Sequence, residues 1–217
     1  MRKIAFIILI LLCFGISIKV HAQSKIYSCN GNYRIELPNK LELQSSELNS
    51  VRNTAAKNKK PQVNVLTRSG HITFQQKGLN ANEKSAYNKY SRVIIEYFKE
   101  DRNNPTFGKG NPIFVDRDVI CAVNEAAKET CRMSGTPLMK IISIESMMIN
   151  SFPVLYFSYR RMGWLKDDGK RQPPVIVNVY RIFNRYESVT IQFSYRENER
   201  ERWKDIHNYI IKTFAFI

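Results

Sequence analysis

The sequence has little histidine and little cysteine, with three and four residues respectively among 217. It contains no C-x-x-C pair, so neither a redox dithiol nor a structural zinc site is indicated. H-E-x-x-H, G-x-S-x-G and the P-loop pattern are absent too, which excludes the metalloprotease, serine-hydrolase and nucleotide-binding motifs that these spacings encode. We therefore predict no catalytic residue, no metal site and no cofactor.

Long hydrophobic runs are equally scarce, and the one present is Ile4–Ile18, which follows two cations. At about 15 residues it is shorter than the roughly 20 that a membrane-spanning helix needs. Val20 and Ala22 then form the small-residue pattern of a signal-peptide cleavage site. We expect residues 1–22 to be a signal peptide and residues 23–217 to be one exported domain, periplasmic or secreted and not membrane-spanning. An uncleaved N-terminal anchor is the alternative.

Three cysteines, Cys29, Cys121 and Cys131, fall in the expected mature chain, where an exported compartment permits disulfides. Cys121 and Cys131 both lie in residues 117–133, whose spacing predicts a helix. Ten helical residues rise about 15 Å, whereas a disulfide needs its α-carbons within about 7 Å. This pair should therefore not bond. The open alternatives are Cys29 joined to one of the other two, or three buried free thiols.

Apolar and polar residues alternate along much of the chain, which predicts strands. Residues 45–61 are polar and indicate an exposed loop with one helical turn, and two short strands are expected around Ser69-Gly70. From residue 139 onward, turn residues separate a dense run of strands. The side chains expected to point inward are Tyr33, Ile35, Leu37, Ile72, Phe74, Val93, Ile95, Tyr97, Val189, Ile191, Phe193 and Tyr195.

Two amphipathic helices are expected beside these strands. One spans about residues 117–133, and the other closes the chain with Trp203, Ile206, Ile210 and Phe214 on one stripe. Strands joined by hairpins form antiparallel sheets, and helices of this kind need a sheet face to cover. The sequence therefore predicts an α+β fold with an antiparallel sheet and one main helix on each face.

Three segments carry a family resemblance. They are an early strand ending in "IELP", the hairpin "SIESMMINSFPVLYFSYR", and a closing strand followed by an amphipathic terminal helix. Together they resemble the PsbP-like α/β/α sandwich, and the central "HITFQQKGL" and "YSRVIIEY" are similar to uncharacterised exported proteins of Bacteroidetes-type bacteria. The resemblance implies that sandwich fold and a role in binding or assembly. It supplies no functional residues.

Positive charge is the one global signal, with a formal net charge of +15. Such a surface attracts polyanions over long distances. The candidate anion-binding residues are Arg160, Arg161, Lys166, Lys170 and Arg171. Outside the cytoplasm the expected partners are lipopolysaccharide, anionic phospholipid, acidic glycans or an acidic protein, and nucleic acid is not expected. A basic surface without a dedicated ligand is the alternative.

The first hypothesis for function is an exported, non-catalytic protein that binds an envelope component or a protein partner through this basic surface. A structural subunit of an envelope assembly is the second, and it predicts an exposed apolar patch or an unpaired strand edge. A hydrolase is the third, and it requires His71 or His207 in a pocket beside a carboxylate or a cysteine.

Overall fold

The computed structural model places most of the chain beyond the expected signal peptide, which itself lies outside the described residues, as does the side chain of Cys29. The described residues are 24–29, 32–45, 51–53, 63–66, 71–100, 107–166 and 168–217. None of the helices in these segments has the length and apolar character that a membrane crossing needs.

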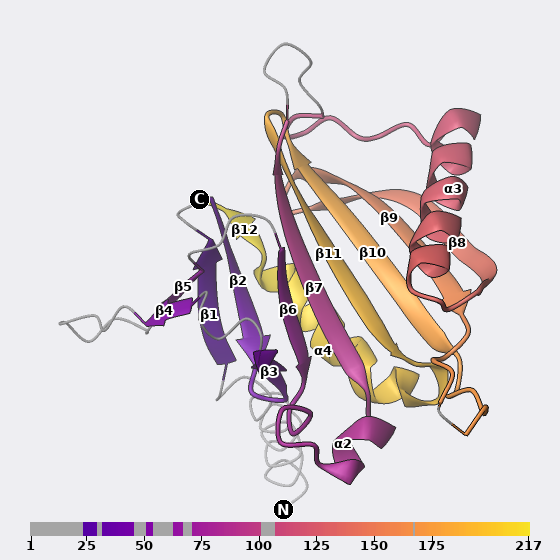
Figure 1. Ribbon diagram of the computed structural model, residues 1–217. Helices are drawn as coiled ribbons and strands as arrows, with labels where there is room; N and C mark the ends of the chain where they lie inside the picture. The colour runs from indigo at the N-terminus through magenta and orange to yellow at the C-terminus, as the bar shows by residue number, and fades with distance from the viewer. Residues whose placement is uncertain are drawn as a thin grey trace, which may run out of the picture.

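Two β-sheets, three α-helices and one short 3-10 helix, η3 (Glu197–Glu199), make up the regular structure of the described residues (Figure 1). The large sheet contains, in spatial order, β3 (Leu41–Leu43), β6 (His71–Gln76), β7 (Ser91–Lys99), β11 (Glu187–Arg196), β10 (Val175–Asn184), β9 (Phe152–Arg161) and β8 (Leu138–Ile149). The small sheet contains β12 (Ala215–Phe216), β2 (Tyr33–Pro38), β1 (Ser24–Cys29), β5 (Val63–Leu66) and β4 (Val51–Asn53). The helices are α2 (Lys84–Asn88), α3 (Arg117–Met133) and α4 (Arg200–Thr213).

Helices cover both faces of the large sheet, as the sequence predicts. Figure 1 shows α3 in front of the large sheet and α4 behind it, with the small sheet beside α4. Every pairing in the large sheet is antiparallel. The predicted α+β fold is therefore confirmed.

The main core lies between the large sheet, α4 and the small sheet. The stripe of α4 predicted from the sequence is buried here, with Trp203, Ile210 and Phe214 fully enclosed. All the side chains that alternation placed inward on β2, β6, β7 and β11 are buried as well. Tyr33 of β2 stacks on Phe214, with ring centroids 5.9 Å apart, which joins the small sheet to the end of α4.

A second, smaller core lies under α3. The helix begins at its cap Asp116, whose carboxylate accepts a hydrogen bond from the Val119 backbone amide at 2.9 Å. It ends at Met133, and two residues later Gly135 turns the chain with a φ of +63°, in the left-handed region that glycine tolerates. Between these ends, Ala127 and Cys131 pack on β9 and β10. Cys121 and Cys131 belong to one continuous helix and do not bond to each other, as their spacing predicts. Both are free thiols, but Cys121 is exposed, so the expectation of three buried thiols is wrong at this position.

Three details differ from the sequence-based expectations. Residues 51–53 of the expected loop form β4, which pairs with β5; of the rest of that loop the structure describes only Ser45, which is exposed. The two strands around Ser69-Gly70 exist, but β5 joins the small sheet and β6 joins the large one. In addition, β5 runs parallel to β1. Alternation of apolar and polar residues predicts which side of a strand faces inward. It does not predict which strand pairs with it, because pairing depends on contacts between segments far apart in the sequence.

Ile210 tests whether α4 is the central packing element. Replacing it with alanine leaves a cavity between the two sheets, so Ile210→Ala should lower the free energy of unfolding by about 2–5 kcal/mol. The matched control is Ile120→Ala on α3, where the isoleucine is 42% exposed and the change should stay within about 0.5 kcal/mol. Urea unfolding monitored by circular dichroism measures both. Equal losses for the two variants would contradict the described packing.

Candidate functional site

The predicted anion-binding residues do not form a single surface. Arg160 and Arg161 are neighbours on β9, so their side chains leave opposite faces of the sheet. Arg160 lies on the α4 face and donates two hydrogen bonds to Glu197, at 3.0 and 2.7 Å. Arg161 is buried on the α3 face, where it donates to the Met162 carbonyl.

The other three predicted cations lie in the loop between β9 and β10. Lys166 and Lys170 are exposed, and a backbone hydrogen bond of 2.9 Å joins them across the turn. Arg171 is also exposed and donates from Nη1 to the Gly163 carbonyl at 3.2 Å. The structure thus brings Lys166, Lys170 and Arg171 together and separates Arg160 and Arg161 from each other. A ligand-binding role for any of them stays a prediction.

A cleft on the α4 face of the large sheet was not expected from the sequence. It encloses about 700 Å³, and we call it the α4 cleft. Its floor is formed by inward-facing residues of β8, β9, β10 and β11, and its wall by α4. The cleft exists because α4 packs on β2 and β11 and leaves part of the same face of β8–β10 uncovered.

The floor of the α4 cleft is polar and aromatic. The Asn178 side-chain oxygen accepts hydrogen bonds from Ser158 Oγ at 2.8 Å and from the Tyr156 hydroxyl at 3.3 Å, and Tyr195 bonds to the same side chain. The rings of Tyr156 and Tyr180 lie side by side, with centroids 4.8 Å apart. Burial raises the pKa of Tyr180 and of Tyr195, so both hydroxyls stay neutral donors.

Cations dominate the rim of the α4 cleft. Lys140 comes from β8, and Arg200 and Lys204 come from the first two turns of α4. Among the described residues, none of these three cations forms an ion pair within 4.0 Å. Two acids line the cleft. Glu197 forms an ion pair with Arg160, so Glu145 is the one acid of the lining whose charge is not balanced in this way. The cleft therefore offers cations beside a hydroxyl-rich, aromatic floor.

His207 forms part of the cleft wall but is itself buried. Its Nε2 lies 3.3 Å from Ser91 Oγ, and its ring stacks on Phe193 with centroids 4.3 Å apart. Burial lowers the pKa of His207 to about 3, so the ring is neutral near pH 7 and a weak base. Ser91 is fully buried and out of reach of a substrate. This pair stabilises the contact between α4 and β7 and has no evident catalytic use.

His71 lies elsewhere, exposed on β6, where its Nδ1 is 3.1 Å from Glu96 and its Nε2 is 3.1 Å from Thr73. His71 does not line the α4 cleft, and the histidine that does, His207, is buried. The α4 cleft therefore does not place an accessible histidine beside a carboxylate or cysteine. The described segments also contain no group of three or more metal-ligating side chains close enough to hold an ion.

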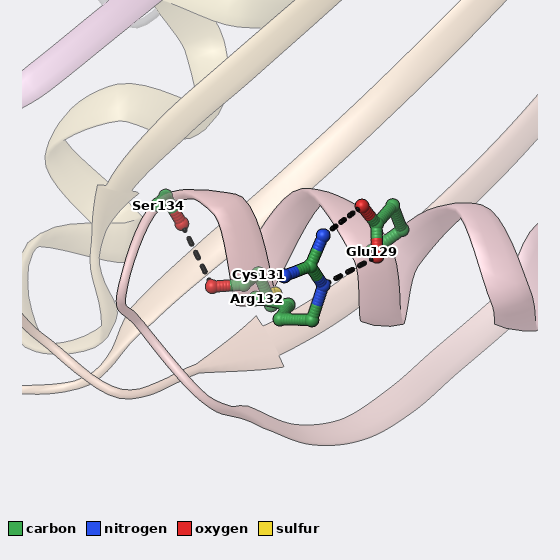
Figure 2. Close-up of polar contacts among 4 residues, drawn as sticks. All are labelled: Glu129, Cys131, Arg132 and Ser134. Atoms are coloured by element: carbon green, nitrogen blue, oxygen red, sulfur yellow. Dashed lines mark hydrogen bonds and ion pairs between the residues drawn. The ribbon is translucent and has the colours of Figure 1, made fainter.

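A smaller hollow of about 430 Å³ lies at the C-terminal end of α3. Figure 2 shows the polar contacts there: Arg132 donates to both carboxylate oxygens of Glu129 at 2.7 and 2.6 Å, and Ser134 Oγ donates to the Cys131 carbonyl at 3.1 Å. Burial raises the pKa of the Cys131 thiol. The charge of Arg132 is thus balanced by Glu129 on the same helix, and the raised pKa makes the Cys131 thiol a poor nucleophile. The α4 cleft is therefore the stronger candidate for a ligand-binding site.

The fold is that of the PsbP-like α+β sandwiches, in agreement with the resemblance seen in the sequence. The solution structure of cyanobacterial PsbP (CyanoP) from Synechocystis sp. PCC 6803 has a TM-score of 0.51 and 14% identity, over 90% of this chain and 94% of that one. At this identity the likeness concerns the fold alone.

Two further solved structures score below 0.5 and support no inference. A protein from Bacteroides thetaiotaomicron has a TM-score of 0.44 and 11% identity, over 90% of this chain and 48% of that chain. The Saccharomyces cerevisiae Ran-binding protein Mog1p has a TM-score of 0.40 and 10% identity, over 86% of this chain and 90% of that chain. The sequence matches no protein-family model and no curated protein.

The buried His207 predicts a dependence of stability on pH. An unfolded histidine titrates near 6.5 and the folded one near 3, so the unfolded chain binds the extra proton as the pH falls below about 6.5. Burial of the neutral His207 ring therefore stabilises the fold fully above about pH 6.5. The free energy of unfolding should fall by about 1 kcal/mol between about pH 7 and about pH 5.5.

Urea unfolding at the two pH values measures the change. His207→Gln should remove most of the difference, whereas His71→Gln, at an exposed position, should keep it. If His207→Gln loses as much stability on acidification as the unaltered chain, His207 is not buried as described.

Proposed function

We propose that the protein is an exported, non-catalytic binding protein that holds an acidic, carbohydrate-like envelope component in the α4 cleft. The observation that carries the proposal is a group of three cations, none of which forms an ion pair with a described residue, beside a floor of tyrosine and amide side chains. Export rests on the N-terminal sequence pattern.

The chemistry of the cleft suits such a ligand in two ways. Lys140, Arg200 and Lys204 have no competing carboxylate within ion-pairing distance among the described residues, so a carboxylate or phosphate group can take that place. The faces of Tyr156 and Tyr180 provide apolar contact for a sugar ring, and the hydroxyl groups around Asn178 provide polar contact. A volume of about 700 Å³ is within the usual range for small-ligand sites.

Strand β8 is a feature in favour of the structural-subunit alternative, because its twelve residues form an edge of the large sheet with no further described strand beside it. Its pairing with β9 is irregular between Leu138 and Lys140 and again between Ile141 and Ser143. Irregularities and charged residues of this kind discourage edge-to-edge association. The α4 cleft therefore supports ligand binding better than the edge supports assembly.

Lys204→Glu tests the proposed function. Calorimetric titration with a trisaccharide of galacturonic acid should detect binding to the unaltered chain, and the uncharged trisaccharide of galactose should bind at least about tenfold more weakly, or about 1.4 kcal/mol. Lys204→Glu places a repulsive charge on the cleft wall and should weaken binding of the acidic probe by at least about tenfold.

The matched control is Lys212→Glu, an exposed lysine about 12 Å further along α4 and outside the cleft. It makes the same change in net charge and should leave the affinity within about twofold. If both variants weaken binding of the acidic trisaccharide equally, the effect comes from net charge alone and the ligand does not bind in the α4 cleft. No binding of the acidic probe at low ionic strength would refute the proposal for acidic saccharides.

A further inference from the structure

The hairpin between β9 and β10 exposes large apolar side chains. Trp164 is 45% exposed and Leu165 is 58% exposed, and Met162 beside them is also exposed. The hairpin lies beyond the ends of both strands, as the orange loop at the lower right of Figure 1. Solvent exposure of tryptophan and leucine side by side is costly unless they meet a partner.

Backbone contacts within the hairpin fix the positions of these side chains. Leu165 bridges Arg171, and the Gln172 amide donates to the Trp164 carbonyl at 2.9 Å. Gly163 lies so close to the returning strand that a β-carbon would clash with the Gln172 carbonyl oxygen, so this tight approach requires glycine. The exposed positions of Trp164 and Leu165 are therefore a fixed part of the fold.

Further apolar residues come from the adjacent turn between α3 and β8. The Met162 amide donates to the Pro137 carbonyl at 2.9 Å, which joins the hairpin to this turn. Met133 and Met139, on either side of Pro137, are both exposed. Together with the hairpin they form what we call the apolar tip, which comprises Met133, Met139, Met162, Trp164 and Leu165.

Cations follow the apolar residues directly. Lys166, Lys170 and Arg171 are all exposed and follow Trp164 and Leu165 in the sequence of the hairpin. Two acids, at positions 167 and 168, oppose them, so the hairpin carries one net positive charge within a chain of +15. The Asp168 carboxylate accepts a hydrogen bond from the Lys170 amide at 3.0 Å, which places it in the turn.

We propose that the apolar tip docks on an anionic lipid bilayer. Tryptophan and leucine favour the boundary between headgroups and acyl chains, and lysine and arginine beside them reach lipid phosphates. Each such cation contributes about 1 kcal/mol at an anionic surface, and the positive charge of the whole chain steers the approach. This surface contains none of the residues that line the α4 cleft, so the inference goes beyond the proposed function.

Tryptophan fluorescence provides the test, because the chain has two tryptophans and Trp203 is fully buried in the core. The sample is the chain from Gln23 onward, which contains every described contact and lacks the hydrophobic N-terminal run that would itself bind lipid. Vesicles of phosphatidylcholine with phosphatidylglycerol should shift the Trp164 emission to shorter wavelength at low salt. Vesicles of phosphatidylcholine alone should bind at least about tenfold more weakly.

Leu165→Asp should weaken vesicle binding, measured by co-sedimentation, by at least about tenfold. The matched control is Phe114→Asp, because Phe114 is 81% exposed and precedes α3 at the end opposite the apolar tip. It should bind as the unaltered chain does, and circular dichroism should show both variants folded. No blue shift with anionic vesicles, equal binding to uncharged vesicles, or equal weakening by Phe114→Asp would each overturn the proposal.

Discussion

The packing of α4 is the constraint on which the rest of the structure depends. Its apolar stripe is buried against two sheets at once, with Trp203 and Ile210 fully enclosed and Tyr33 of the small sheet stacked on Phe214. Because the helix is held over β2 and β11, it cannot also cover the whole of the same face of β8–β10. The part that it leaves uncovered is the α4 cleft, so the packing of α4 explains both the core and the candidate site.

Local patterns were sufficient for the long strands and the main helices, and insufficient for the short strands and for the division into sheets. The alternation in β7 and β11 and the three- or four-residue spacing in α4 predicted which side chains are buried, and the structure confirms them. The division into two sheets could not be predicted in this way. Whether β5 pairs with β6 beside it or with β1 across the fold depends on contacts between distant segments, which periodicity does not encode.

The candidate site was missed because its cations are far apart in the sequence. The predicted anion-binding residues all lie between positions 160 and 171, whereas Lys140 lies on β8 and Lys204 on the polar side of α4. One signal was present. Asn178 interrupts the inward-facing row of β10 between Ile176 and Tyr180, and a polar side chain at such a position marks either a buried network or a lined cavity.

Amide hydrogen exchange tests the central claim, the burial of α4 between the two sheets, most directly. If the account is correct, the amides around Trp203, Ile206 and Ile210 exchange only through global unfolding, and urea accelerates them with the full dependence of the unfolding transition. The short helix α2, with one buried side chain, should exchange by local opening. Exchange of the α4 amides as fast as those of α2 under native conditions would contradict the account.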